Sequence, residues 1–150
     1  MSDLSIECWR IDAQPDALVL PKETIVDVVA TPEIKTDGAL PAPWMAGYLH
    51  WQQQDIPLMC FEQLIDAEFE RPDIPPKALV LSPIPKAARQ GHSAILFFGN
   101  VQSIEIGNTI EDVAIPAAFD RRYGEAAFEM EGQTLVVPKL SALGVAFAYF

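Results

Sequence analysis

The sequence predicts a mainly β protein built from two similar halves, and three observations support this prediction. Short apolar runs separated by turn residues extend along the whole chain, which is typical of β-sandwiches and β-barrels. Thirteen prolines disfavour long helices, because proline lacks a backbone donor and clashes with the preceding helical turn. A pattern of two strands followed by a short helix occurs twice, from residue 51 and again from residue 130.

The apolar runs place the expected strands in chain order. We expect strands at residues 6–11, 17–20, 45–51, 56–60, 78–81, 94–98, 101–106, 126–130 and 134–137. Helical signals are few. They predict one or two turns within 22–30, a short helix at 61–66 and a third helix from Leu140 onward.

The repeated pattern aligns residues 51–64 with residues 130–143 without gaps. Glu131-Gly132 supplies the glycine that a tight hairpin turn favours. We therefore predict one domain over 1–150, with a first half at about 12–70, a second at about 77–140, and terminal segments packing across them. Apolar residues match at Trp51/Met130, Ile56/Leu135, Leu58/Val137, Phe61/Leu140 and Leu64/Leu143.

Composition limits the class of protein. A chain of 150 residues that is half apolar is long enough to bury a core without a metal or a disulfide. Cys8 and Cys60 have no CxxC spacing and the chain shows no export leader, so we expect a reduced, cytoplasmic setting. No apolar run approaches the roughly 20 residues that a membrane helix needs, which argues against direct membrane insertion.

The formal net charge of −11 argues against a nucleic-acid partner, because phosphate binding depends on clustered lysine and arginine. Residues 1–74 contain 4 basic and 14 acidic side chains, whereas residues 75–150 contain 6 and 7, so the two parts carry −10 and −1. This asymmetry fits either a basic partner for the first part or an acidic surface that maintains solubility.

Several motifs follow one another along the chain: Ala17-Leu-Val-Leu-Pro21, Ile25-Val-Asp-Val-Val29, Pro41-Ala-Pro43, Trp44-Met-Ala-Gly47, Ile56-Pro57-Leu58, Ala94-Ile-Leu-Phe-Phe98 with Asn100-Val101, Ser103-Ile-Glu-Ile106, and the closing hairpin and helix at 124–143. In this order they resemble the CheW-like coupling proteins of bacterial chemosensory arrays. The resemblance implies two packed five-stranded, SH3-like β-barrels with a few short helices around a shared core.

The resemblance also implies a function. Such proteins are non-enzymatic adaptors that need no cofactor or metal, and they couple the cytoplasmic tip of a chemoreceptor to the regulatory domain of a CheA-type histidine kinase. Two arginines of the family pattern are absent here. The Asn-Leu-Arg-Gly turn reads His50-Trp51-Gln52-Gln53, and the later Asp-Leu-Arg reads Cys60-Phe61-Glu62. These departures suggest a divergent stand-alone member, similar to the ChpC-type proteins of pilus-linked twitching motility.

The resemblance places a partner-binding groove between the two halves. Three aromatic residues crowd the adjacent hairpin, and large amphipathic side chains are common both at binding hot spots and in cores. The residues expected to line the groove or its rim are Val28, Val29, Leu49, Trp51, Gln52, Gln53 and Val101.

Two other functions remain open at the level of sequence. One is a β-barrel scaffold in a different signalling complex. The other is a small-molecule-binding or hydrolytic barrel in which Cys60 acts as a thiol nucleophile and His50 as its base. This second alternative requires a deep pocket with the two side chains within hydrogen-bond reach.

Overall fold

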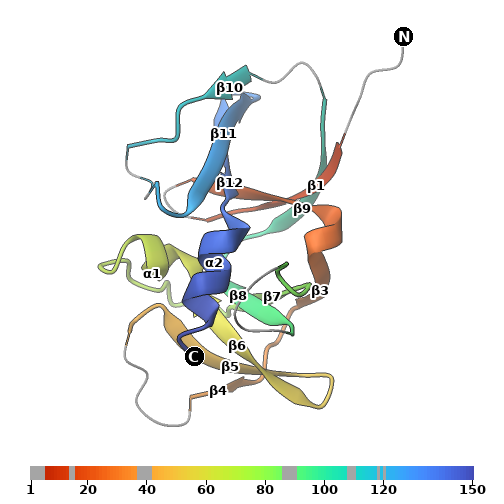
Figure 1. The fold of residues 1–150 in the computed structure, drawn as a ribbon, viewed down its shortest axis with the longest axis vertical. Helices are drawn as coiled ribbons and strands as arrows, with labels where there is room; N and C mark the ends of the chain where they lie inside the picture. Colours follow the sequence, from red (N-terminus) through yellow and green to blue (C-terminus); the bar gives the residue numbers. More distant parts are fainter. Residues whose placement is uncertain are drawn as a thin grey trace.

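The computed structural model describes residues 6–13, 16–36, 42–85, 91–107, 111–117, 119 and 121–150. Within these residues the chain forms two six-stranded sheets, seen in the lower and upper parts of Figure 1. The middle sheet contains β3 (Ile25–Val29), β4 (Ile34–Lys35), β5 (Met45–Trp51), β6 (Gln54–Cys60), β7 (Lys77–Leu81) and β8 (Ser93–Phe97). The terminal sheet contains β1 (Ile6–Ile11), β2 (Ala17–Pro21), β9 (Val101–Ile106), β10 (Glu111–Val113), β11 (Gly124–Met130) and β12 (Gln133–Pro138). The helices are η1 (Lys22–Thr24), α1 (Phe61–Ile65) and α2 (Leu140–Phe147).

The two sheets have the same internal order. The middle sheet runs β4-β5-β6-β8-β7-β3, and the terminal sheet runs β10-β11-β12-β2-β1-β9. In each sheet the second strand of a hairpin, β6 or β12, precedes a helix and pairs in parallel with β8 or β2. The halves are therefore a permuted repeat, in which the N-terminal strands β1 and β2 complete the half that ends the chain.

The predicted limits of the halves, 12–70 and 77–140, do not match this pairing. β7 and β8 lie in the middle sheet with the earlier strands, whereas β1 and β2 lie in the terminal sheet with the later ones. Each sheet also has six strands where five were expected, because the short strands β4 and β10 extend the edges. Apolar runs mark where strands form but carry no information about distant partners.

The helical prediction at 22–30 is only partly correct. η1 takes up Lys22–Thr24, and the chain then continues as β3. Three valines and an isoleucine within β3 explain the change, since β-branched side chains favour extended backbone. The helices expected at 61–66 and from Leu140 are present as α1 and α2.

The two repeated hairpins turn in the same way. Gln52 and Gln53 have φ of 48° and 63°, and Glu131 and Gly132 have φ of 52° and 77°. Positive φ at both central residues is the signature of a type I′ turn, whose twist matches the flanking strands. The correspondence predicted between 51–64 and 130–143 therefore extends to turn geometry.

Replacing Gln53 by glycine is expected to stabilise the protein by about 0.5–1 kcal/mol. A non-glycine residue in the left-handed region costs roughly 1–2 kcal/mol, and the greater entropy of unfolded glycine offsets part of that gain. Urea unfolding of Gln53→Gly measures the effect. The control is Gln54→Gly, in the extended and exposed start of β6, which should lose stability. Equal losses in both variants would contradict the strain argument.

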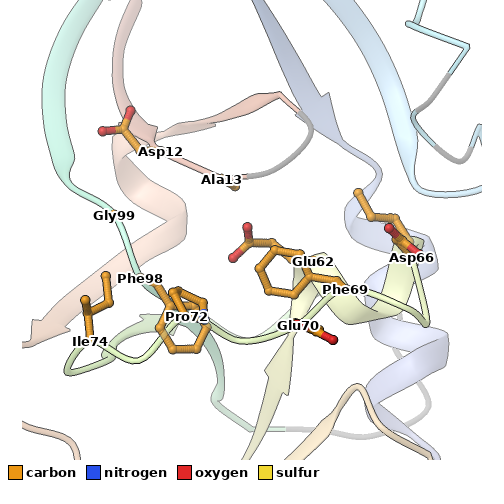
Figure 2. Close-up of a pocket in the computed structure, with 11 residues that line it drawn as sticks. Asp12, Ala13, Glu62, Asp66, Phe69, Glu70, Pro72, Ile74, Phe98 and Gly99 are labelled. Atoms are coloured by element: carbon orange, nitrogen blue, oxygen red, sulfur yellow. The ribbon is translucent and has the colours of Figure 1, made fainter.

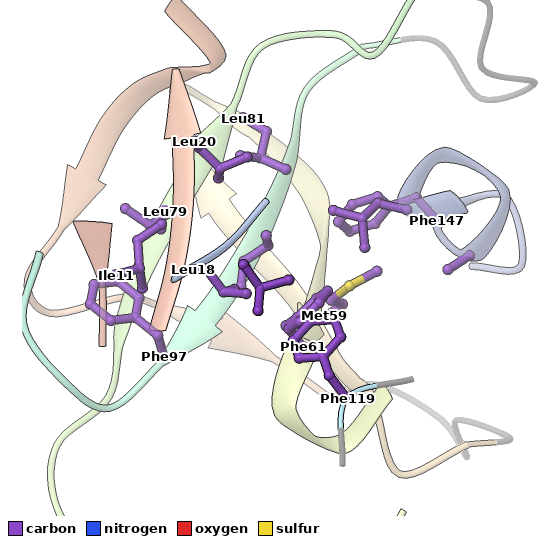
Figure 3. Close-up of a cluster of buried hydrophobic side chains, with 14 of the residues drawn as sticks. Ile11, Leu18, Leu20, Met59, Phe61, Leu79, Leu81, Phe97, Phe119 and Phe147 are labelled. Carbon is purple, nitrogen blue, oxygen red and sulfur yellow. The ribbon is translucent and has the colours of Figure 1, made fainter. Parts of the chain in front are cut away.

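A shared core joins the two sheets. Leu79 and Ile95 from the middle sheet pack in one buried cluster with Leu18 from the terminal sheet, and Figure 3 shows side chains of this cluster gathered from both sheets. The chain neighbours of Leu79 and Ile95 belong to a second buried cluster inside the middle sheet: Ala78, Val80, Ala94 and Leu96. β7 and β8 are thus buried on both faces, which explains their continuous apolar sequences.

Helix α2 closes the junction of the sheets. It follows β12 and lies beside the middle sheet in Figure 1. Leu143 and Phe147 are buried in the shared core, while Val145 on the opposite side of the helix is 61% exposed. The last helix of the terminal half therefore packs against both halves.

Candidate partner-binding surface

Strand β3 forms one edge of the middle sheet and exposes apolar side chains. It pairs with β7 along one side only. Val28 lies opposite Leu79, which belongs to the shared core, and directly paired residues point to the same face of a sheet. Val28 therefore faces the junction with the terminal sheet, yet it remains 40% exposed. Val26, at an irregularity in the β3–β7 pairing, is 47% exposed.

The β5–β6 hairpin is tied to this edge through Trp51. Its indole Nε1 donates a hydrogen bond of 2.9 Å to Oδ2 of Asp27 in β3. The Trp51 ring also lies 4.9 Å from the ring of His92, measured between centroids. The other carboxylate oxygen of Asp27 accepts the backbone N–H of Val28 at 2.8 Å. One carboxylate thus fixes both the tryptophan and the local backbone of the exposed edge.

A second set of polar contacts holds the same hairpin close to its turn. Nδ1 of His50 lies 2.9 Å from Oδ1 of Asp55, and Nζ of Lys35 donates to Oδ2 of that carboxylate at 3.2 Å. The hydrogen bond from His50, followed by the one from Lys35, lowers the pKa of Asp55. The stability that ionised Asp55 contributes to the fold is therefore present above the ordinary aspartate pKa. It is lost as the pH falls through the lowered pKa of Asp55.

The predicted groove residues divide between two faces of the middle sheet. Val28 faces the junction, and Val101 in β9 packs half-buried against the shared core. Val29 and Trp51 instead pack against the cluster inside the middle sheet. Leu49 belongs to that inner cluster and is 0% exposed, so its side chain is not available to a partner in the folded protein.

The candidate surface also includes the tip of the β5–β6 hairpin and three residues that were not predicted from the sequence. Gln52 and Gln53, the residues predicted for the rim, lie exposed at the hairpin tip. Val26, Asp27 and His92 were not predicted. Successive residues of a strand point to opposite faces of the sheet, so the sequence of β3 places Val28 and Val29 on different faces. The contacts of Trp51 with Asp27 and His92 are visible only in the structure.

The structure contradicts a catalytic pair formed by Cys60 and His50. His50 is paired with Asp55 across the hairpin, and Cys60 lies five residues farther along β6, or roughly 17 Å at the rise of an antiparallel strand. Cys60 is fully buried, and this burial raises the pKa of its thiol and disfavours the nucleophilic thiolate. His50, the proposed general base, instead contacts Asp55 across the hairpin.

Within the described ranges, no three His, Cys, Asp or Glu side chains are grouped as metal ligands would be. The helices found in that part of the chain are also too short or too polar to cross a membrane.

No family model matches this sequence, and no curated protein does so. Among solved structures, the chain is similar to the scaffolding protein TtCheW from Thermoanaerobacter tengcongensis. The TM-score is 0.73 at 13% sequence identity, and the match covers 91% of this chain and 90% of that chain. The chain has a CheW-like fold.

The CheW-like fold confirms the predicted mainly β class with a few short helices. The match spans nearly the whole of both chains, so it includes both sheets and not a single hairpin. At 13% identity it concerns the fold. The chemistry of the CheW-like surface must therefore be argued from the residues of this chain.

Proposed function

We propose that the chain is a non-enzymatic, cytoplasmic adaptor of a bacterial chemosensory array. It couples the cytoplasmic tip of a chemoreceptor to the regulatory domain of a CheA-type histidine kinase. The neighbour in the structural comparison is a scaffolding protein, which supports this class of function. The observation that carries the proposal is Val28, which is 40% exposed on the face toward the terminal sheet. The family resemblance implies a partner groove at that junction, and the exposed Val28 supports it.

The rest of the β3 edge suits a docking role. Exposed valines at an unpaired strand edge provide apolar area, and Asp27 holds Trp51 in a fixed orientation on the other face of the same strand. A surface fixed in this way loses little conformational entropy when a partner binds. Receptor state would then reach the kinase through the geometry of these contacts.

A pilus-linked, twitching-motility system is the proposed setting. The arginine of the family turn is replaced by Gln52, which is exposed at the hairpin tip. Glutamine lacks the planar five-donor group with which arginine binds carboxylates in a bidentate manner. This change favours a divergent stand-alone adaptor with its own kinase over the general coupling protein of a flagellar array.

An affinity-tagged copy expressed in the source bacterium tests the proposal. The native chain is expected to capture a CheA-type kinase and a chemoreceptor, both identified by mass spectrometry. Val28→Asp is expected to reduce their capture at least about tenfold, because a charge enters the apolar contact at a cost above 1.4 kcal/mol. The identity of the kinase, pilus-linked or flagellar, decides the pathway.

The matched control is Ile6→Asp, which introduces the same charge at a 60% exposed apolar position in β1. Circular dichroism and urea unfolding verify that both variants remain folded. Equal capture of kinase and receptor by the two variants would show that Val28 is not part of the interface. Absence of kinase and receptor with the folded native chain would reject the adaptor function itself.

A further inference from the structure

A cavity of about 790 Å³ lies at the junction of the two sheets, separate from the β3 edge. Its lining comes from four segments: the residues after β1, helix α1, the connection from α1 to β7, and the turn from β8 to β9. Figure 2 shows Asp12 on one side of the space and Pro72 and Ile74 on the other. Neither Val28 nor Val101 lines it.

Much of the wall is apolar. Phe69, Pro72, Ile74 and Phe98 line the cavity, and Ile74 remains 50% exposed. A volume of this size is within the range of pockets that bind whole ligands or several side chains, about 300–1,000 Å³. The cavity therefore offers apolar contact to an occupant larger than a single ion.

The polar part of the wall is entirely anionic among its described lining residues. Four carboxylates, Asp12, Glu62, Asp66 and Glu70, line the cavity, and that lining includes no lysine, arginine or histidine. Glu62 is only 4% exposed. Asp12 lies 3.6 Å from the Arg10 guanidinium, which offsets part of the charge at one side. An occupant that adds positive charge fits this wall.

The charge of the wall also distinguishes this chain from the family pattern. The Asp-Leu-Arg of that pattern reads Cys60-Phe61-Glu62 here, so a hydrogen-bond donor has become an acceptor. The change is in a residue of α1 that lines the cavity. It adds a carboxylate to the wall where the family pattern has a guanidinium.

We propose that this cavity is a docking site for a peptide segment of a partner protein that carries arginine or lysine beside an apolar residue. The long stems of these basic side chains pack against Phe69 and Phe98, while their charged ends reach the carboxylates. The neighbouring apolar residue contacts Pro72 and Ile74. The site is independent of the function proposed for the β3 edge.

The apolar wall argues for a peptide over a small free cation. A metal ion or a polyamine would use the carboxylates but would leave the contacts to Phe69, Pro72 and Ile74 unused. A segment with alternating basic and apolar side chains uses both kinds of wall at once.

Fluorescence anisotropy with a labelled hexapeptide, Gly-Leu-Arg-Leu-Arg-Gly, tests the proposal with the full chain. Saturable binding is expected, with an affinity that falls as salt is added. Replacing both arginines of the peptide by citrulline, a neutral isostere, is expected to weaken binding at least about tenfold, since hydrogen bonds between charged groups are lost. The same loss is expected for the chain variant Asp12→Asn plus Glu70→Gln.

The matched chain control is Glu111→Gln plus Glu129→Gln, which removes two exposed carboxylates from paired positions of β10 and β11. It should bind the peptide as the native chain does. Ile74→Ser tests the apolar wall without changing charge and should weaken binding severalfold.

Three results would overturn the proposal. One is the absence of saturable binding at low salt with millimolar peptide. Another is equal weakening by both double variants, which would assign the effect to net charge alone. The third is full competition by spermidine at concentrations equal to those of the peptide, which would identify a site for small cations.

Discussion

Replacing Leu79 by alanine lowers the free energy of unfolding by about 3–5 kcal/mol, the range for large-to-small changes in tightly packed cores. Leu79 is 0% exposed and lies in β7, between β3 and β8. It packs in the shared core with side chains from both sheets, so the two sheets together limit collapse of the resulting cavity. Urea unfolding at constant pH measures the loss.

The control for this variant is Val26→Ala, which removes apolar atoms from a 47% exposed position of the adjacent strand. Its cost should stay below about 1 kcal/mol. A loss under 1 kcal/mol for Leu79→Ala, with an unchanged dependence on urea, would mean that the shared core is loosely packed. The junction of the sheets would then be a poor support for either proposed docking site.

Replacing Gly47 by alanine is expected to cost about 2–4 kcal/mol. Gly47 has φ of +136°, a conformation that is essentially restricted to glycine. A Cβ atom there would also meet the backbone carbonyl oxygen of Lys35 in β4. Relief of that clash requires β4 to move away from β5, which would disturb the pairing of Ile34 with Leu49.

Gly132→Ala separates backbone strain from the clash. Gly132 also has positive φ, at +77°, but beyond its two chain neighbours no other residue has an atom within 4 Å of an added Cβ. Its replacement should therefore cost only the conformational part, about 1–2 kcal/mol. Amide hydrogen exchange adds a second measurement, because only Gly47→Ala should reduce protection in β4 and β5. Equal costs and equal protection in the two variants would refute the close approach of Lys35.

Local sequence was sufficient to locate most strands. The expected runs 6–11, 45–51 and 101–106 match β1, β5 and β9 to the residue, because each combines strand-favouring side chains with a polar residue or glycine directly after it. The strands β3, β4 and β10 were not predicted. The residues of β3 lie in the segment 22–30 that was expected to contain helical turns. With two and three residues, β4 and β10 are too short to show alternation, and pairing with a neighbouring strand defines them.

The partners of the strands were harder to predict. The parallel pairing of Ala17 with Leu135 joins residues near opposite ends of the chain, and no motif around either residue encodes that contact. The repeat at 51–64 and 130–143 correctly indicated two similar halves. It did not indicate that the second half takes its last two strands from the N-terminus.

The candidate surface was predicted only in part, because it also depends on contacts between residues that are distant in the sequence. Strand alternation is visible in sequence, and it separates Val28 from Val29 once β3 is accepted as a strand. Burial of Leu49 depends on which face of β5 meets the inner cluster, and this is decided by distant strands. The cavity beside α1 was invisible in sequence because four separate segments form it.

The permuted repeat sets an order of events during synthesis on the ribosome. All strands of the middle sheet lie within one stretch that ends at Phe97, so that sheet can assemble while the remainder is still being made. β1 and β2 precede the middle sheet in the chain, but β12, the parallel partner of β2, follows that sheet at residues 133–138. Until β12 has been made, the edge of β2 in the first hairpin has no partner, so Ile11 and Leu18 must be kept from aggregating during that interval.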